Sequence, residues 1–182
     1  MARTTSRQLQ AWNQRLRHPL ALAVNLSGRQ FESEQLVQQL AALGQPPLEL
    51  ELTETLLVAE PERARQQLQQ LVGAGLRIAI DDFGTGYSSL SYLKQFPFQI
   101  LKIDRAFVRN VDSDERNAAI VTAVLQMAQQ LQLRVVAEGV ETEAERAFLA
   151  HHGCHEAHTN SRGLCTRLRT PKLPQYGSHV LW

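Results

Sequence analysis

The alternation of short apolar runs with amphipathic stretches is the feature that most constrains the fold of this 182-residue chain. Each of five apolar runs is followed by a segment in which apolar residues recur with helical spacing. This order predicts a parallel α/β sheet, because each helix returns the chain to the same edge of the sheet. We expect strands over 20–26, 47–51, 76–80, 98–103 and 133–137, and helices over 34–43, 61–74, after Tyr87, over 116–131 and over 143–151.

Two details of the helices refine this prediction. Gly44 is expected to cap the helix over 34–43. In the long helix over 116–131, the residues Ile120, Val124, Met127 and Leu131 lie on one face.

The composition changes at about residue 155. From Ala157 to Trp182 the sequence contains no Asp or Glu, and Pro171, Pro174 and Gly177 interrupt it. We see no convincing sixth strand–helix unit there. The chain is therefore expected to form one domain over residues 1–155, followed by an atypical, irregular tail over 156–182.

Charge and hydropathy exclude several classes of protein. The net charge of +1 gives no case for DNA binding or for an acidic membrane surface. The longest apolar runs are short and interrupted, and the polar start lacks the apolar core of a signal peptide. Two cysteines are too few for a disulfide framework. We expect a cytoplasmic protein, or the cytoplasmic part of a larger one, with no direct membrane insertion.

Polar side chains stand at the end of every expected strand: Asn25, Glu51 with Glu54, Asp81 with Asp82, Lys102 with Asp104, and Glu138 with Glu141. In a (β/α)8 barrel the carboxyl ends of the strands converge on one mouth, where the active site lies. Carboxylates crowded together need cations, and oxygen ligands suit Mg²⁺ or Mn²⁺. Two such ions bridged by a carboxylate suit in-line displacement at phosphorus.

Asp81 and Asp82 close a strand and are followed at once by a glycine-rich loop. The strand fixes the two carboxylates, and the glycines let the loop fold tightly over them. Lys102, opposite such carboxylates, would polarise or deprotonate a water molecule. Taken alone, an acidic residue after a strand is a helix cap or a solvated loop residue about 70% of the time. A lone strand lysine is usually a surface group. Because polar residues end five successive strands, a helix-cap or loop role for the acidic residues and a surface role for Lys102 are both less favoured.

Three other motifs do not support a function. Asp82-Phe83-Gly84 resembles the kinase metal-binding triplet, but no glycine-rich nucleotide loop or His-Arg-Asp loop accompanies it. Gly84-Thr85-Gly86 lacks the Gly-Lys-Ser of a Walker loop. The spacing of His151, His152, Cys154, His155 and His158 fits no standard zinc site, so a solvated helix end and tail is favoured.

Five ordered motifs closely resemble the EAL-type cyclic-di-GMP phosphodiesterase family: Asn25–Ser27, Glu51–Glu54, Asp81–Leu90, Leu101–Asp104 and Ala137–Thr142. The resemblance runs from about Gln8 to Cys154. It implies a modified TIM barrel that takes part in bacterial signal transduction. The implied reaction is Mg²⁺- or Mn²⁺-dependent hydrolysis of cyclic-di-GMP to linear pGpG.

The resemblance also implies roles for individual residues. Asn25, Glu51 and Asp81 correspond to metal ligands, and Asp82 to the ligand of a second metal. Glu54 corresponds to the residue that holds the 82–89 loop.

Lys102 corresponds to the group that orients or deprotonates the nucleophilic water, and Glu138 to a further acidic site residue. Asp104 and Glu141 match the motifs without a defined role.

Two departures from the family pattern bear on activity. The Glu-Ala-Leu triplet is absent, and so is the Gln-Gly-Tyr triplet, with His158 near the expected Gln. A (β/α)8 barrel typically needs about 250 residues. We therefore expect an incomplete modified TIM barrel, truncated at its N-terminus, with weak or no activity. One alternative is a non-catalytic cyclic-di-GMP-binding or protein-interaction module. Another is that a partner chain, for example in a homodimer, supplies the missing strand.

Overall fold

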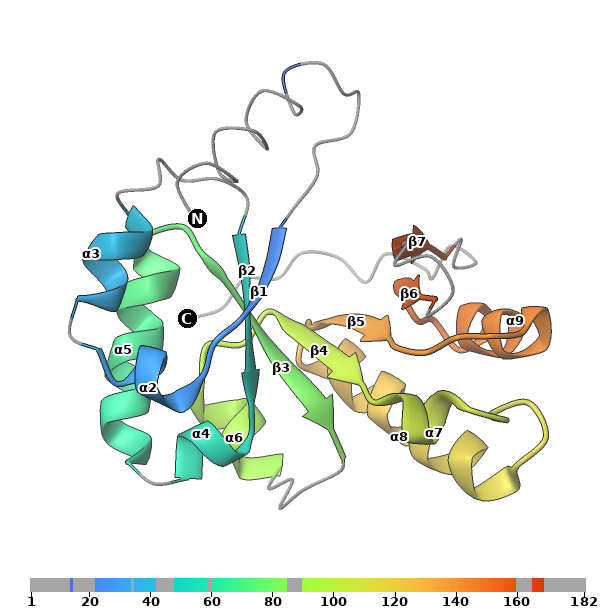
Figure 1. Cartoon of the computed structure of the whole chain (residues 1–182). Coiled ribbons are helices and arrows are strands. Elements are labelled where there is room, and N and C mark those ends of the chain that lie inside the picture. The colour runs from blue at the N-terminus through green and yellow to red at the C-terminus, as the bar shows by residue number, and fades with distance from the viewer. Residues whose placement is uncertain are drawn as a thin grey trace, which may run out of the picture.

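A single curled sheet forms the centre of the computed structural model, which describes residues 14, 22–33, 35–41, 48–58, 60–84, 90–159 and 165–168. Its strands follow one another in chain order, parallel as far as β6, while β7 is antiparallel to β6 (Figure 1). The strands are β1 (Leu22–Asn25), β2 (Leu48–Thr53), β3 (Arg77–Phe83), β4 (Ile100–Ile103), β5 (Arg134–Ala137), β6 (Glu156–His158) and β7 (Cys165–Arg167). Parallel neighbours in chain order are the arrangement of a barrel wall, so the expected incomplete TIM barrel is confirmed.

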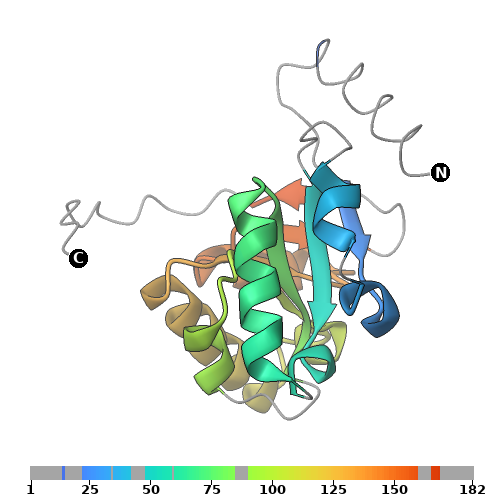
Figure 2. The same ribbon diagram turned by 90° about the vertical axis from the view of Figure 1, so that its left-hand side faces the viewer.

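Helices connect the parallel strands and cover the outer face of the sheet. The described helices are α2 (Gly28–Phe31), α3 (Leu36–Ala41), α4 (Thr55–Val58), α5 (Pro61–Gly73), α6 (Leu90–Gln95), α7 (Arg105–Val108), α8 (Glu115–Gln130) and α9 (Glu143–His151). Helix α5 contacts β3 and α8 contacts β5, and α5 lies in front of the strands in Figure 2. Every expected helix has a counterpart here. Gly44 and residues 85–89, just ahead of α6, lie outside the described residues.

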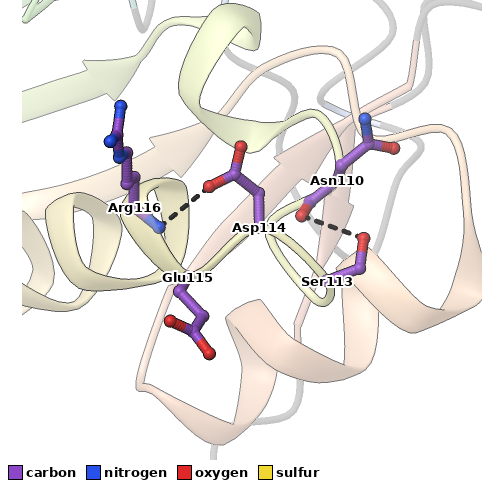
Figure 3. Close-up of a pocket in the computed structure, with 5 residues that line it drawn as sticks. All are labelled: Asn110, Ser113, Asp114, Glu115 and Arg116. Carbon is purple, nitrogen blue, oxygen red and sulfur yellow. Dashed lines mark hydrogen bonds between the residues drawn. The ribbon is translucent and has the colours of Figure 1, made fainter.

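The starts of the longer helices have local chemical causes. Pro61 occupies the first turn of α5, where its missing N–H costs no hydrogen bond. Asp114 caps α8, because its Oδ1 accepts hydrogen bonds from the backbone N–H of Arg116 at 2.8 Å and of Asn117 at 3.2 Å. Figure 3 shows this start of α8, where an open hollow is lined by polar residues of the α7–α8 connection.

The two faces of the sheet differ in chemistry, because successive strand residues point to opposite sides. The outer face carries the fully buried Leu50, Ile78 and Leu101, which belong to the main core beneath the helices. On the inner face, Ala79, Ile100 and Val136 form a small separate apolar cluster. The other inner positions at the carboxyl ends of the strands, such as Asn25, Glu51 and Lys102, are polar or charged.

Arg134 on β5 shows how strongly the sheet curls. Its Nη1 lies 3.1 Å from Glu156 Oε1 on the adjacent β6, and its Nη2 lies 2.5 Å from Glu49 Oε1 on β2. Strands β2 and β5 are separated by β3 and β4 in the sheet. A side chain can join them only across the concave inner face, so this ion-pair network closes the curl.

Two features differ from the sequence-based expectations. Strands β6 and β7 lie in the segment 156–182, for which we expected irregular structure; residues 169–182 lie outside the described residues. Backbone pairing with β5 requires no apolar side-chain pattern, which is why the sequence did not reveal β6. In α8 the buried positions are Val121, Leu125 and Ala128, whereas Ile120 and Leu131 of the apolar face are exposed.

Among the described helices, none is both long enough and apolar enough to cross a membrane.

Candidate functional site

The register of the parallel strands brings the polar strand ends to one place on the inner face. Asn25 on β1 is the register partner of Glu51 on β2, and Thr53 on β2 is the partner of Asp81 on β3. Partners in a parallel ladder point to the same side of the sheet, so the side chains of Asn25 and Glu51 share the inner face. Lys102 on β4 continues this face as the partner of Val136 on β5.

Lys102 is the centre of the site. Its Nζ lies 2.9 Å from Glu51 Oε1, 2.9 Å from Asp81 Oδ1 and 2.7 Å from Glu138 Oε1. The residue is only 5% exposed, so it is not a solvated surface lysine. An ammonium group has three N–H donors, and here each faces a carboxylate from a different strand or strand end. One buried cation thus holds the ends of β2, β3 and β5 together.

The electrostatics follow from this arrangement. Burial lowers the pKa of Lys102, but the carboxylates, with Glu138 first, outweigh it and hold the pKa above its ordinary value. The pKa of Glu138 is lowered to about 2 by His158 and then, against the effect of burial, by Lys102. Burial raises the pKa of Glu51 despite its contact with Lys102. Burial and then the neighbouring Asp81 raise the pKa of Asp82.

A group able to hold a cation adjoins Lys102. Carboxylate oxygens of Asp81, Asp82 and Glu138 all lie within 4.8 Å of one another. Three converging carboxylates suit hard divalent cations such as Mg²⁺ and Mn²⁺, so the donor set fits the metal ions that the sequence predicts. Among these three, Glu138 was expected as an acidic site residue rather than as a ligand. Glu51 is not one of these three carboxylates, but it contacts Lys102 beside them.

An irregularity in β3 explains how two adjacent residues can serve one site. Neighbours on a strand normally point to opposite faces, but the register between β3 and β4 shifts between Ile80 and Phe83. Asp82 has a φ of +51°, a left-handed conformation that Asp tolerates better than most residues. Such a bulge re-aims a side chain. It lets the carboxylate of Asp82 join that of Asp81.

The remaining expected residues lie at the border of the site. Glu54 is buried at the end of β2, but residues 85–89 of the loop that it is expected to hold lie outside the described residues. Asp104 caps α7, since its Oδ1 accepts a hydrogen bond from the backbone N–H of Ala106 at 2.7 Å. Glu141 is exposed, and its backbone N–H donates to Glu145 Oε2 at 2.9 Å.

His158 is a site residue that we did not predict. Its Nδ1 lies 3.8 Å from Glu138 Oε1, and its side chain is 35% exposed. Two signals in the sequence pointed to it: its place near the Gln expected from the family resemblance, and its position two residues after Glu156. The second signal can be used only once β6 is known to be a strand, because residues two apart then lie on the same face.

The sequence of residues 1–158 matches the family model described as EAL domain. The chain is 43% identical over 155 residues to the bifunctional diguanylate cyclase/cyclic di-GMP phosphodiesterase MucR of Pseudomonas aeruginosa. The alignment covers 82% of this chain and 23% of that relative. The chain spans about a fifth of the length of the first curated relatives that it matches, between 18% and 23%.

Solved structures resemble this fold over most of the chain. The PaMucR phosphodiesterase in complex with c-di-GMP has a TM-score of 0.81 and 38% sequence identity, covering 91% of this chain and 70% of that one. The manganese and cyclic-di-GMP complex of BlrP1 from Klebsiella pneumoniae has a TM-score of 0.73 and 34% identity, covering 84% of this chain and 39% of that one.

Proposed function

Because the chain belongs to the EAL domain family, we propose that its inner face binds cyclic-di-GMP and hydrolyses one of its phosphodiester bonds to give linear pGpG. The observation that carries this proposal is the contact of buried Lys102 with Glu51, Asp81 and Glu138 at the ends of β2, β3 and β5. Two similar structures that are complexes with cyclic-di-GMP, one of them also with manganese, support the choice of substrate and metal.

The residues that would hold two Mg²⁺ or Mn²⁺ ions are Asn25, Glu51, Asp81 and Asp82, and Glu138 lies close enough to Asp81 and Asp82 to join them. When bound, such ions lower the pKa of a water molecule and stabilise charge on the phosphate oxygens. Asp81 contacts Lys102 and is one of the three converging carboxylates, and the same holds for Glu138.

Lys102 serves this reaction as a donor. Its contacts with three carboxylates keep the ammonium group protonated, so it has no free pair of electrons with which to take a proton from water. A fixed, buried N–H donor can orient the attacking water and balance the carboxylate charge. Between the two roles implied by the resemblance, we propose the orienting one.

We expect slow turnover from the 182-residue chain taken alone, because its sequence contains neither the Glu-Ala-Leu nor the Gln-Gly-Tyr triplet of the family. Removing one stabilising contact from a transition state costs on the order of 10²–10³ in rate. The test is chromatographic measurement of pGpG formed from cyclic-di-GMP with Mg²⁺ or Mn²⁺. Rates typical of enzymes, about 1–10³ s⁻¹, would contradict the expected impairment.

Calorimetry with Ca²⁺ in place of Mg²⁺ measures binding of cyclic-di-GMP and, together with the hydrolysis assay, distinguishes a phosphodiesterase from a non-catalytic binding module. Binding of cyclic-di-GMP, with slow hydrolysis in Mg²⁺ that Asp81→Asn abolishes, supports the phosphodiesterase. Binding without any metal-dependent hydrolysis supports the binding module. No binding under either condition sinks both proposals.

A cytoplasmic location and a homodimer are further parts of this proposal. Among the described strands, β1 and β7 form the two edges of the sheet, and an exposed edge can pair with another chain. Light scattering across a concentration series tests the assembly. A mass that stays at the monomer value of 20.5 kDa argues against a homodimer.

A further inference from the structure

The bulge that turns Asp82 toward the site needs support from outside β3. Asp82 and Gly84 both have a positive φ, +51° and +100°. Glycine adopts this conformation freely, but a residue with a side chain keeps it only where the surrounding structure imposes it. Contacts from another element are therefore expected to hold Asp82 in the orientation that the site uses.

Helix α7 supplies such contacts at two points. Burial, then Asp81 and then Asp104 raise the pKa of the Asp82 carboxyl, so the side chain of Asp104, which caps α7, lies beside the bulge. Three residues further along, the ring of Phe107 lies over Gly84. A Cβ added to Gly84 would stand 2.8 Å from Cε2 and 3.3 Å from Cζ of this ring. The ring thus occupies the place where a side chain of residue 84 would begin.

Helix α7 is itself held in place, so Phe107 is a fixed support. Val108 is fully buried in the main core, and Phe107 packs against the same core with part of its surface exposed. Asn117 on α8 donates from Nδ2 to the carbonyl oxygen of Arg109 at 3.0 Å, which joins the end of α7 to α8. A shift of the bulge toward α7 would therefore meet a ring that cannot easily move away.

We propose that Phe107 is a positioning residue for Asp82: its ring holds the bulge in the conformation that aims the carboxylate of Asp82 at the cation site. The inference deepens the proposed function, because it rests on the same metal site. It gives Phe107 no contact with an ion or a substrate. A phenylalanine that only fills the core would contribute to stability and leave the metal affinity unchanged, and this difference separates the two roles.

The first experiment determines whether Asp82 belongs to a cation site. Free Mn²⁺ is followed by its electron paramagnetic resonance signal while the metal-free chain and its Asp82→Asn variant are titrated in turn. Saturable binding that weakens about tenfold or more in Asp82→Asn establishes the role of Asp82. If the unaltered chain binds no Mn²⁺ saturably, the metal site of the proposed function fails and this inference with it. Saturable binding that Asp82→Asn leaves unchanged overturns this inference alone.

The second experiment compares two partly buried phenylalanines. Phe107→Leu should weaken Mn²⁺ binding about tenfold, at the lower end of the losses seen when groups behind metal ligands are removed. The matched control is Phe148→Leu, because Phe148 on α9 packs against the same core and is also partly buried. Both variants should lower the temperature of thermal unfolding, but only Phe107→Leu should lower the Mn²⁺ affinity. Equal Mn²⁺ affinities of the two variants would show that Phe107 serves the core alone.

A double-mutant cycle tests whether Phe107 acts through Asp82. In the Asp82→Asn background, Phe107→Leu should cost little further Mn²⁺ affinity, because the carboxylate that the ring positions is already gone. Two residues that act independently would instead give losses that add in free energy, about a hundredfold in the double variant. Such additivity would overturn the inference while leaving the metal site in place.

Discussion

At the scale of single residues, the site depends on one buried cation among several carboxylates. Burying a charge costs several kcal/mol unless opposite charges and hydrogen bonds compensate it. Lys102 meets this condition through three contacts of 2.7–2.9 Å. The carboxylates are in turn stabilised by Lys102, because without a cation they would repel one another in a partly desolvated site. Lys102 therefore stabilises the site even before any metal ion binds.

Lys102→Met should destabilise the metal-free chain by about 3 kcal/mol, the cost of removing one partner from a buried ion pair. Urea unfolding in EDTA measures this loss. Mn²⁺ should raise the stability of the variant more than that of the unaltered chain, because it replaces the missing positive charge. Lys94→Met, at an exposed position on α6, is the control and should change stability by less than about 0.5 kcal/mol. Equal stability of the two variants in EDTA would argue against this role.

Gly84 is the second residue on which the site depends, because it follows the bulge at Asp81 and Asp82. It has a φ of +100°, and an added Cβ would lie 2.8 Å from Cε2 of Phe107 on α7. Gly84→Ala should therefore lower the free energy of unfolding by more than the roughly 1–3 kcal/mol of backbone strain. It should also weaken Mn²⁺ binding.

Gly75→Ala is a matched control for this prediction. Gly75 has a φ of +86° but no atom within 4 Å of an added Cβ, so its variant carries the strain without the clash. It should leave Mn²⁺ affinity unchanged. If both variants lose the same stability and bind Mn²⁺ alike, the contact with Phe107 does not support the site.

At the scale of elements, buried Glu145 on α9 ties two loops together. Its Oε1 accepts a hydrogen bond from the backbone N–H of Asn110 at 2.9 Å, and its Oε2 accepts from those of Glu141 at 2.9 Å and Thr142 at 3.0 Å. The first loop follows α7, and the second leads from Glu138 to α9. Glu145 thus holds the segment that presents Glu138 to Lys102.

Glu145→Gln should cost about 1–3 kcal/mol at pH 7, because one buried N–H acceptor becomes a donor. Burial raises the pKa of Glu145, but the backbone N–H groups outweigh it and leave the pKa below its ordinary value of 4.5. The stabilisation is therefore complete above pH 4.5 and declines as the pH falls below it. The difference between the two proteins in urea unfolding should shrink from pH 7 to pH 3. Exposed Glu143→Gln on the same helix should show almost no difference at either pH.

At the scale of the whole molecule, the curl of the sheet depends on Arg134. We expect Arg134→Met to lower the free energy of unfolding by about 2–3 kcal/mol, between the values for exposed and buried ion pairs, since its side chain is 27% exposed. Amide hydrogen exchange in β6 should accelerate, because Glu156 loses its partner. Arg77→Met is the control: Arg77 Nη1 lies 3.5 Å from Glu49 Oε1, and its side chain is 46% exposed. Unchanged exchange in β6 would show that backbone pairing alone holds the curl.

Elements with strong local signals were predicted closely. Helix α9 begins and ends as expected, since the capping box of Thr142 and Glu145 marks its start. The short helices α2, α4 and α7 were missed, because four residues are too few to show periodicity. The buried face of α8 was not recognised, because apolar residues occur on two of its faces and only packing decides which one is covered.

The order of the first five strands and their longer helices, the membership of the EAL domain family and the polar strand ends were all predictable from the amino-acid sequence, because they depend on residue type and spacing along the chain. The sequence did not reveal which of those polar groups touch. That Lys102 joins Glu51, Asp81 and Glu138, that a bulge turns Asp82 toward them, and that His158 lies beside Glu138 depend on register and curl. These are properties of residues far apart in sequence, and only tertiary packing decides them.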